Sequence, residues 1–290
     1  MDQDQRRYPT DTPPEQQNRL PGIEENMYLR PQFDRAEYKG SGKLKDKVAL
    51  ITGGDSGIGR AVASLYAKEG AHVVIVYYDE HRDAEFTKEE VEKEGVECLL
   101  IPGDLRKEAF AKEAIQKTIE KFGKLDILVS NAATAILKDQ IEDVHCEDFV
   151  TTFETNVFGA FYITKEAVPH LKEGSTIIFT TSDSAYKGQK NGLDYASSKA
   201  AVLGFMRSLS LQLVDRGIRV NGISPGPIWT PLIPASQPRS TVDTFGQETP
   251  MKRVGQPEEL APGYVLLASE DSSYMSGQVI HINGGMVVNG

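Results

Sequence analysis

Cysteine is scarce in this chain of 290 residues, where only Cys98 and Cys146 occur. A disulfide framework is therefore excluded, and we expect both residues to be reduced thiols in a cytoplasmic protein. No apolar run reaches 18 residues, so no membrane-spanning helix is expected. The N-terminus is polar and lacks the apolar core of a secretory signal. The five histidines show no spacing typical of a metal site, so none is predicted.

Basic residues are also in the minority, and the net charge is −10. This charge argues against binding of nucleic acid. Two catalytic motifs are incomplete or absent. Ser184-Ala-Tyr-Lys187 matches the S-x-x-K of penicillin-recognising enzymes, but its S-D-N and K-T-G partners are missing, and no G-x-S-x-G elbow occurs. Hydrophobic residues make up 39% of the chain, enough for the core of one large α/β domain.

Apolar runs alternate with segments of helical periodicity from Asp46 onward. The runs are nearly continuous in apolar residues, as in Val73-Val-Ile-Val76, which is typical of strands buried on both faces of a parallel sheet. We expect strands at 47–52, 72–77, 97–101, 125–130, 175–181, 218–223 and 277–282. We expect helices at 58–69, 83–94, 107–122, 147–172, 194–215 and 257–269. This α/β pattern predicts a single Rossmann-type, doubly wound parallel sheet of about seven strands flanked by helices.

The first 43 residues differ from the rest of the chain. They are rich in Gln, Pro, Arg, Asp and Glu, with scattered aromatic residues. We expect residues 1–43 to form a largely irregular arm that lies over the domain or over a neighbouring subunit. We expect residues 44–290 to form one folded domain.

A glycine-rich turn, Thr52-Gly-Gly-Asp-Ser-Gly-Ile-Gly59, follows the first predicted strand and opens the first predicted helix. This order is the context that a dinucleotide site requires. Glycines let the backbone approach a pyrophosphate, whose charge is met by the helix N-terminus.

A second motif, Tyr195-Ala-Ser-Ser-Lys199, places a phenol and an amine one helical turn apart on one face. A lysine cation close to a phenol favours the phenolate and lowers its pKa, so the pair predicts a tunable acid/base. Ser182 lies thirteen residues before Tyr195 and is expected to hold a substrate oxygen beside it. Ser184 is a rival for that role.

These motifs together resemble the short-chain dehydrogenase/reductase family, in its compact branch. The resemblance extends over residues 44–290. Within that branch the long arm and the segment at 226–234 resemble a bacterial subgroup described by similarity to glucose and ribitol dehydrogenases. The residues that carry it, in chain order, are T-G-x-x-x-G-x-G at 52–59, Asn131-Ala-Ala133, Asn156, Ser182, Tyr195, Lys199 and Pro225-Gly226.

The resemblance implies an NAD(P)-dependent oxidoreductase that moves a hydride between nicotinamide and a small alcohol or carbonyl substrate. Tyr195 is then the acid/base, and Lys199 binds the nicotinamide ribose. Asn156 anchors a water, unless it bonds the backbone inside a helix. Ala133 departs from the family's usual glycine. The implied cofactor-binding residues are Gly53, Asp55, Ser56, Gly57, Ile58, Gly59, Tyr77, Tyr78, Asp104, Leu105, Asn131, Ala132, Ala133, Tyr195, Lys199, Pro225, Gly226, Ile228 and Thr230.

The end of the second strand bears on the choice between NAD and NADP. Family enzymes that use NAD often carry an Asp there, and this chain carries Tyr77 and Tyr78. The following Asp79-Glu80 would repel a 2′-phosphate, whereas Arg60 and Arg82 would attract one. The balance favours NAD(H) and leaves NADP open.

The substrate is less constrained by the sequence. We expect a loop at 226–250 to cover the site, with Trp229, Leu232, Ile233 and Phe245 either walling a pocket or packing down as a lid. Residues 135–137 and 186–193 are the other expected walls. The resemblance also implies a homotetramer. The alternative is a catalytically silent, dinucleotide-binding regulatory or stress-associated oligomer.

Overall fold

Seven parallel strands form the centre of the computed structural model, which describes residues 8–286. The strand order is β3-β2-β1-β4-β5-β6-β7, as in a doubly wound sheet. The sheet therefore confirms the predicted fold, and each strand begins and ends within two residues of its expected position. The strands are β1 (Val48–Thr52), β2 (His72–Tyr77), β3 (Cys98–Pro102), β4 (Ile127–Ser130), β5 (Thr176–Thr180), β6 (Arg219–Pro225) and β7 (Val279–Ile282).

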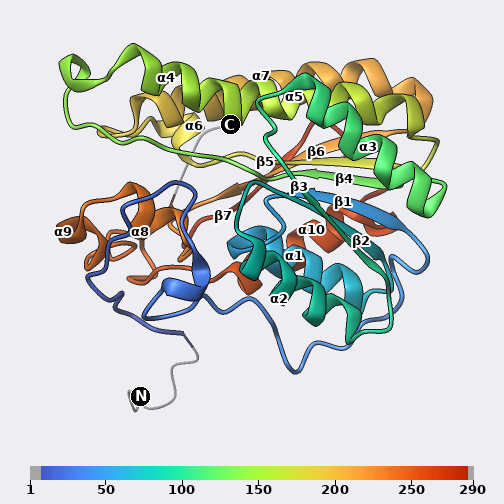
Figure 1. Ribbon diagram of the computed structural model, residues 1–290, viewed down its shortest axis with the longest axis horizontal. Coiled ribbons are helices and arrows are strands. Elements are labelled where there is room, and N and C mark those ends of the chain that lie inside the picture. Colours follow the sequence, from blue (N-terminus) through green and yellow to red (C-terminus); the bar gives the residue numbers. More distant parts are fainter. Residues whose placement is uncertain (1–7, 287–290) are drawn as a thin grey trace.

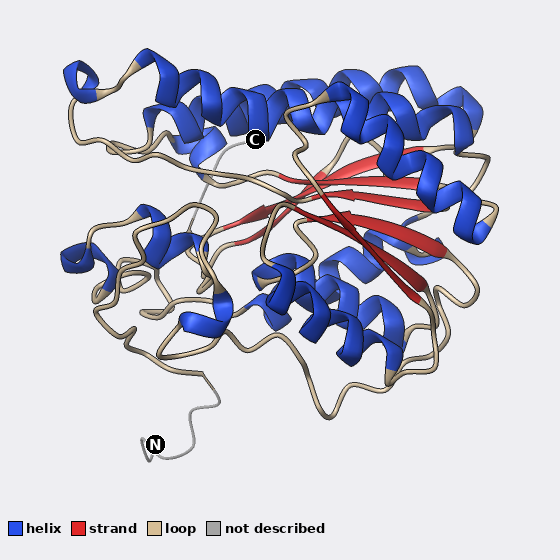
Figure 2. Cartoon of the chain, viewed as in Figure 1, coloured by secondary structure: helices blue, strands red, loops and turns tan. Residues whose placement is uncertain are grey.

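Helices cover both faces of this sheet (Figures 1 and 2). Three of them, α1 (Gly57–Lys68), α2 (His81–Glu92) and α10 (Pro257–Ala268), lie below it in the view of Figure 1. The upper layer contains α3 (Glu108–Phe122), α4 (Cys146–Phe153), α5 (Gly159–Ala167), α6 (Ser184–Lys187) and α7 (Leu193–Leu213). Each layer closes a separate apolar core against one face of the sheet, which is why the strands are apolar on both faces.

The predicted helix at 147–172 is wrong as one continuous element. The chain instead forms α4, a π-helical turn η4 (Glu154–Phe158), α5, and a final 3₁₀ turn η5 (Val168–His170). A π-helical turn inserts one extra residue and often occurs at functional sites. Here it contains the buried Asn156.

The segment after β6 contains helices that the sequence did not predict. They are α8 (Leu232–Ser236) and α9 (Arg239–Val242), each of which begins directly after a proline, Pro231 or Pro238. The fixed φ of proline suits the first positions of a helix. Pro231 and Pro238 therefore favour the start of α8 and α9.

The N-terminal arm, blue in Figure 1, runs across the lower layer and beneath α8 and α9. One 3₁₀ turn, η2 (Glu24–Asn26), is its only helical element among residues 8–43. Two hydrogen bonds anchor the arm to the segment after β6. Trp229 Nε1 donates to Leu29 O at 2.7 Å, and Gln17 N donates to Pro234 O at 2.7 Å. A third apolar cluster seals the contact and comprises Met27, Trp229, Ile233, Val242 and Val254.

None of the helices between residues 8 and 286 combines the length and the hydropathy that a bilayer span requires.

The arm's anchor can be tested with two neighbouring residues. Met27 is 5% exposed in the third cluster, whereas Tyr28 beside it is 83% exposed. Met27→Ala should lower the free energy of unfolding by about 2–3 kcal/mol, because it leaves a cavity. Tyr28→Ala is the matched control and should change it by less than about 0.5 kcal/mol. Urea unfolding followed by circular dichroism measures both, and equal effects would contradict an anchored arm.

Candidate active site

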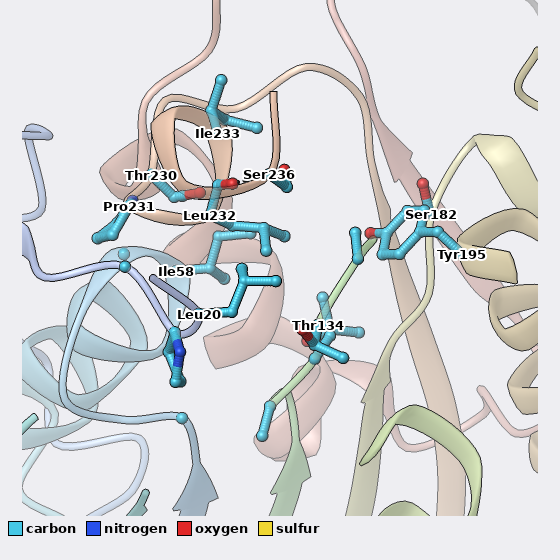
Figure 3. Close-up of a pocket in the computed structure, with 18 of the residues that line it drawn as sticks. Leu20, Ile58, Thr134, Ser182, Tyr195, Thr230, Pro231, Leu232, Ile233 and Ser236 are labelled. Atoms are coloured by element: carbon cyan, nitrogen blue, oxygen red, sulfur yellow. Dashed lines mark hydrogen bonds between the residues drawn. The ribbon is translucent and has the colours of Figure 1, made fainter. Parts of the chain in front are cut away.

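A cavity of about 760 Å³ lies beyond the carboxyl ends of the strands, where doubly wound sheets bind their ligands. Residues that follow β1, β2, β3, β4, β5 and β6 line it, together with the arm and the segment after β6. Figure 3 shows Leu20 of the arm and Ile58 of α1 on one side, and Ser182 and Tyr195 on the other. The volume is within the range of small-molecule and cofactor sites.

The glycine turn between β1 and α1 has the conformation that close approach to a ligand requires. Gly53 and Gly57 have φ of +63° and +51°, which side chains disfavour. A Cβ at Gly59 would lie 1.9 Å from Gly53 O, so only glycine lets α1 pack against the end of β1. The turn therefore presents backbone N–H groups and a helix N-terminus to the cavity and fits a dinucleotide pyrophosphate.

Asn131 holds the ends of three strands together. Its Nδ2 donates to the carbonyl oxygens of Thr52 and Gly53 at 3.1 Å, and its Oδ1 accepts from Thr180 Oγ1 at 3.0 Å. Thr52 Oγ1 in turn accepts from the N–H groups of Asn131 and Ala132, at 2.9 and 3.0 Å. The loops that line the cavity are thereby fixed to one another.

Tyr195 lies half-buried in the cavity wall, and Figure 3 shows its phenol beside Ser182. Loss of water around the phenol raises its pKa to about 12, although a hydrogen bond with Ser182 acts in the opposite direction. Ser182 also accepts a hydrogen bond from Ser184 Oγ at 2.9 Å. Ser182 lines the cavity and Ser184 is not among its lining residues, so the geometry favours Ser182 of the two rivals.

Lys199 is buried, and its Nζ donates to Thr180 O at 2.8 Å. The same Nζ lies 5.6 Å from the centroid of the Tyr195 ring. Burial lowers the pKa of Lys199 to about 8. The expectation of a lowered pKa for Tyr195 is not met, because burial raises the pKa of the phenol.

Asn156 does not line the cavity. Its side chain accepts from Thr134 N at 2.7 Å and donates to Thr134 O and to Ser198 Oγ, each at 2.9 Å. The π-helical turn thus aims Asn156 at the loop after β4 and at the helix that carries Tyr195. These contacts are those of a helix-interior Asn that bonds backbone, one of the two expected roles.

The cavity brings together every predicted cofactor residue except Gly59, whose contribution is the close packing described above. The arm is the part of the site that the sequence did not predict. Leu20, Pro21 and Gly22 line the cavity, and a Cβ at Gly22 would lie 2.3 Å from Pro231 O. Nothing in the arm's composition marks these residues as ligand-binding.

The sequence left Arg60 open as a group that would attract a 2′-phosphate, and the structure gives it other partners. It is 3% exposed and forms ion pairs with Glu24 of the arm and, at 3.4 Å, with Asp83. Its Nη2 also donates to Asp55 O at 2.7 Å. Arg82 is 82% exposed and points to Glu25, 3.4 Å away. Both arginines therefore connect the arm to the domain.

The segment at 226–250 is both wall and lid. Leu232, Ile233 and Phe245 line the cavity, whereas Trp229 is fully buried behind them. On the opposite side the loop after β4 contributes residues 135–137, and the segment after α6 contributes Gln189 and Asn191. Among residues 8–286 no group of three metal-ligating side chains occurs.

A family model described as enoyl-(acyl carrier protein) reductase matches residues 53–287, which carry the glycine turn and the Ser182, Tyr195 and Lys199 positions. The chain belongs to the short-chain dehydrogenase/reductase family. The chain is 55% identical to the uncharacterised oxidoreductase YhxC of Bacillus subtilis over 96% of this chain and 97% of that one. It is 48% identical to the NADPH-dependent aldehyde reductase 1 of Arabidopsis thaliana, over 95% and 98% of the two chains. A glucose and ribitol dehydrogenase of Daucus carota is 47% identical, over 96% and 98%.

Solved structures of this family share the fold. A short-chain dehydrogenase of Burkholderia cenocepacia in complex with NADP has a TM-score of 0.79 and 31% identity, over 84% of this chain and 98% of that one. A 3-ketoacyl-(acyl-carrier-protein) reductase of Brucella melitensis complexed with NADH has a TM-score of 0.76 and 33% identity, over 83% and 98%. Family membership supports an oxidoreductase that uses a nicotinamide dinucleotide, and the neighbours include both forms.

The lowered pKa of Lys199 predicts how its removal changes stability with pH. Between pH 8 and pH 10.5 the unfolded chain binds more protons at Lys199 than the folded chain, so this residue makes stability rise with pH. Lys199→Met should lack that contribution. The difference in unfolding free energy, wild type minus variant, should therefore increase across this window, by up to about 3 kcal/mol. Urea unfolding at several pH values measures this difference. Lys112→Met, at an exposed residue of α3, is the control. A difference that stays flat would show that Lys199 titrates normally.

Proposed function

We propose that this chain is an NAD(P)-dependent oxidoreductase that interconverts a small-molecule carbonyl and its alcohol, with Tyr195 as the acid/base. The observation that carries the proposal is the position of the Tyr195 phenol beside Ser182, in the wall of a cavity that begins at the glycine turn. Family membership and the dinucleotide-bound relatives give independent support.

The cofactor would lie along the carboxyl ends of the strands. The turn at 53–59 would receive the pyrophosphate, Asp104-Leu105 the adenine side, and Asn131-Ala-Ala133 together with Pro225-Gly226 the nicotinamide side. The nicotinamide supplies or takes up the hydride, and the protein binds, orients and handles protons. A methyl group at Ala133, where the family usually has glycine, lines the cavity without closing it.

Tyr195 keeps its proton at neutral pH, because burial raises its pKa to about 12. The phenol would donate this proton to a carbonyl oxygen in reduction, and the phenolate would accept one from the alcohol in oxidation. Ser182 would donate a hydrogen bond to the same oxygen and polarise the carbonyl. The hydroxyl of Ser184 donates to Ser182 at 2.9 Å and fixes its orientation.

Lys199 remains mostly protonated at pH 7, since its pKa is about 8. One of its protons is donated to Thr180 O at 2.8 Å, and we propose that others reach the nicotinamide ribose. Asn156 would act as a positioning residue, through the loop at Thr134 and through Ser198 on α7. A water anchored there would connect Lys199 to solvent.

Replacement of Tyr195 tests the acid/base role. Tyr195→Phe removes the hydroxyl alone and should lower kcat for carbonyl reduction about 10²- to 10⁴-fold. The dissociation constant for NADH or NADPH should change less than about threefold. Tyr274→Phe, at a fully exposed tyrosine, is the matched control and should leave kcat unchanged.

The alternative function is that of a catalytically silent dinucleotide-binding protein. A wild-type chain that binds a dinucleotide tightly, yet turns over no aldehyde, ketone, sugar or polyol, would favour that reading. Loss of binding and of activity together in Tyr195→Phe would instead indicate a structural role for the phenol.

We further propose a cytoplasmic homotetramer that assembles through α5 and α7. Apolar side chains on these helices and directly next to them are exposed in the single chain, namely Phe158, Phe161, Leu193, Leu211 and Val214. Such residues, gathered on adjacent helices, are typical of an interface.

Leu211→Asp tests that interface, because Leu211 is 78% exposed and a charge there opposes burial. The molar mass from light scattering should fall from that of four chains to that of two or one. Ile141→Asp, at a residue 67% exposed outside α5 and α7, is the control and should not change it. A monomeric wild type would contradict the proposal.

A further inference from the structure

Two buried carboxyl groups face the end of the cavity that lies beyond β2. Asp55, in the glycine turn, is 5% exposed, and Glu80, just before α2, is 3% exposed. Both line the cavity together with Tyr77 and Tyr78. In doubly wound dinucleotide folds this end of the second strand receives the adenosine ribose. The two acids therefore stand where ribose hydroxyl groups would lie.

One carboxylate oxygen there is unsatisfied. Glu80 Oε2 accepts from Asp79 N at 3.1 Å, whereas Glu80 Oε1 is buried and has no hydrogen-bond partner among residues 8–286. Its nearest cation, Arg19 Nη2 of the arm, is 4.0 Å away and pairs with Asp79 instead. Buried polar atoms are rarely left without a partner, so this oxygen indicates a donor that the protein itself does not provide.

Tyr77, at the position where family enzymes that use NAD often carry an Asp, does not supply an acid. Its hydroxyl is 3.0 Å from His81 Nδ1, and the two rings meet edge to face. The carboxyl groups come instead from the turn after β1 and from the residue before α2. The end of β2 itself carries no acid, and Asp55 and Glu80 provide carboxyl groups next to it.

The electrostatic environment is poor in available cations. Arg60 pairs with Glu24 and Asp83, and Arg106 pairs with Asp104 through two nitrogens, at 2.9–3.2 Å. Arg19, 4.0 Å from Glu80, pairs with Asp79. Burial first, and then the charge of Asp55, raises the pKa of Glu80 to about 7. A further dianion beside these groups would be opposed, whereas a hydroxyl donor would stabilise the carboxylate form.

We propose that Glu80, with Asp55 beside it, accepts hydrogen bonds from the hydroxyl groups of the adenosine ribose and thereby selects NAD(H) over NADP(H). The proposal rests on the proposed dinucleotide-dependent function and adds the residues that choose between the two cofactors. Glu80 Oε1 needs a hydrogen-bond donor. A 2′-phosphate would instead place a negatively charged acceptor beside it. Leu20, Pro21 and Gly22 of the arm line the same cavity.

Binding of NADH and NADPH to the intact chain tests the proposal without turnover. Wild-type protein should bind NADH at least about tenfold more tightly than NADPH, as measured by calorimetry or by nicotinamide fluorescence. ADP-ribose and its 2′-phosphate should show the same order, which places the discrimination at the ribose. Glu80→Gln removes the charge but keeps the shape, and should reduce the NADH/NADPH affinity ratio about tenfold.

Glu89→Gln, at an exposed acid of α2, the helix that follows Glu80, is the matched control and should keep the wild-type ratio. If Glu80→Gln does not fold, two other measurements test whether these acids select NAD(H). They are the NADH/NADPH affinity ratio of Asp55→Asn and the wild-type comparison of ADP-ribose with its 2′-phosphate. Equal or tighter binding of NADPH by wild type, or a ratio that survives in Glu80→Gln, would overturn this inference alone. Failure of folded wild type to bind any of the four ligands would overturn the proposed function as well.

Discussion

The side chain of Asn131 is the contact on which the rest of the site depends. Parallel strands leave their carboxyl ends as separate loops, and nothing in the sheet's own hydrogen bonding holds those loops in register. One amide joins the ends of β1, β4 and β5, because it donates to two carbonyl groups of the glycine turn and accepts from Thr180. Thr180 O then receives Lys199 Nζ, so the same cluster also positions the amine. The glycine turn and Lys199 of α7 are thereby connected through Asn131 and Thr180.

The fold was predictable because its physical signals are local. Continuous apolar runs such as Val73–Val76 identify strands that are covered on both faces, and the glycine turn identifies where the first helix begins. The positions of Ser182, Tyr195 and Lys199 also follow from spacing, since the carboxyl ends of parallel strands meet at one edge. The cavity lining agrees with that expectation.

Other features were not predictable because they depend on contacts between distant segments. The arm docks through Met27, through Glu24 and through the Leu29 carbonyl, none of which forms a periodic pattern. The π-helical turn at Asn156 looks like ordinary helix in the sequence. The pKa of Tyr195 is set by burial as well as by charge, and burial cannot be read from a Tyr-x-x-x-Lys spacing.

The buried contact between Glu24 and α1 has a practical consequence. Glu24 Oε2 accepts from Gly57 N at 2.7 Å, so a carboxylate from the arm caps the helix whose N-terminus faces the cofactor site. A chain trimmed to begin at Leu44, before the first motif at 52–59, would keep every motif intact. It would nevertheless lose a helix cap, the partner of a buried arginine and one wall of the cavity. For this protein the span of the recognised motifs is therefore shorter than the part of the chain that builds the site.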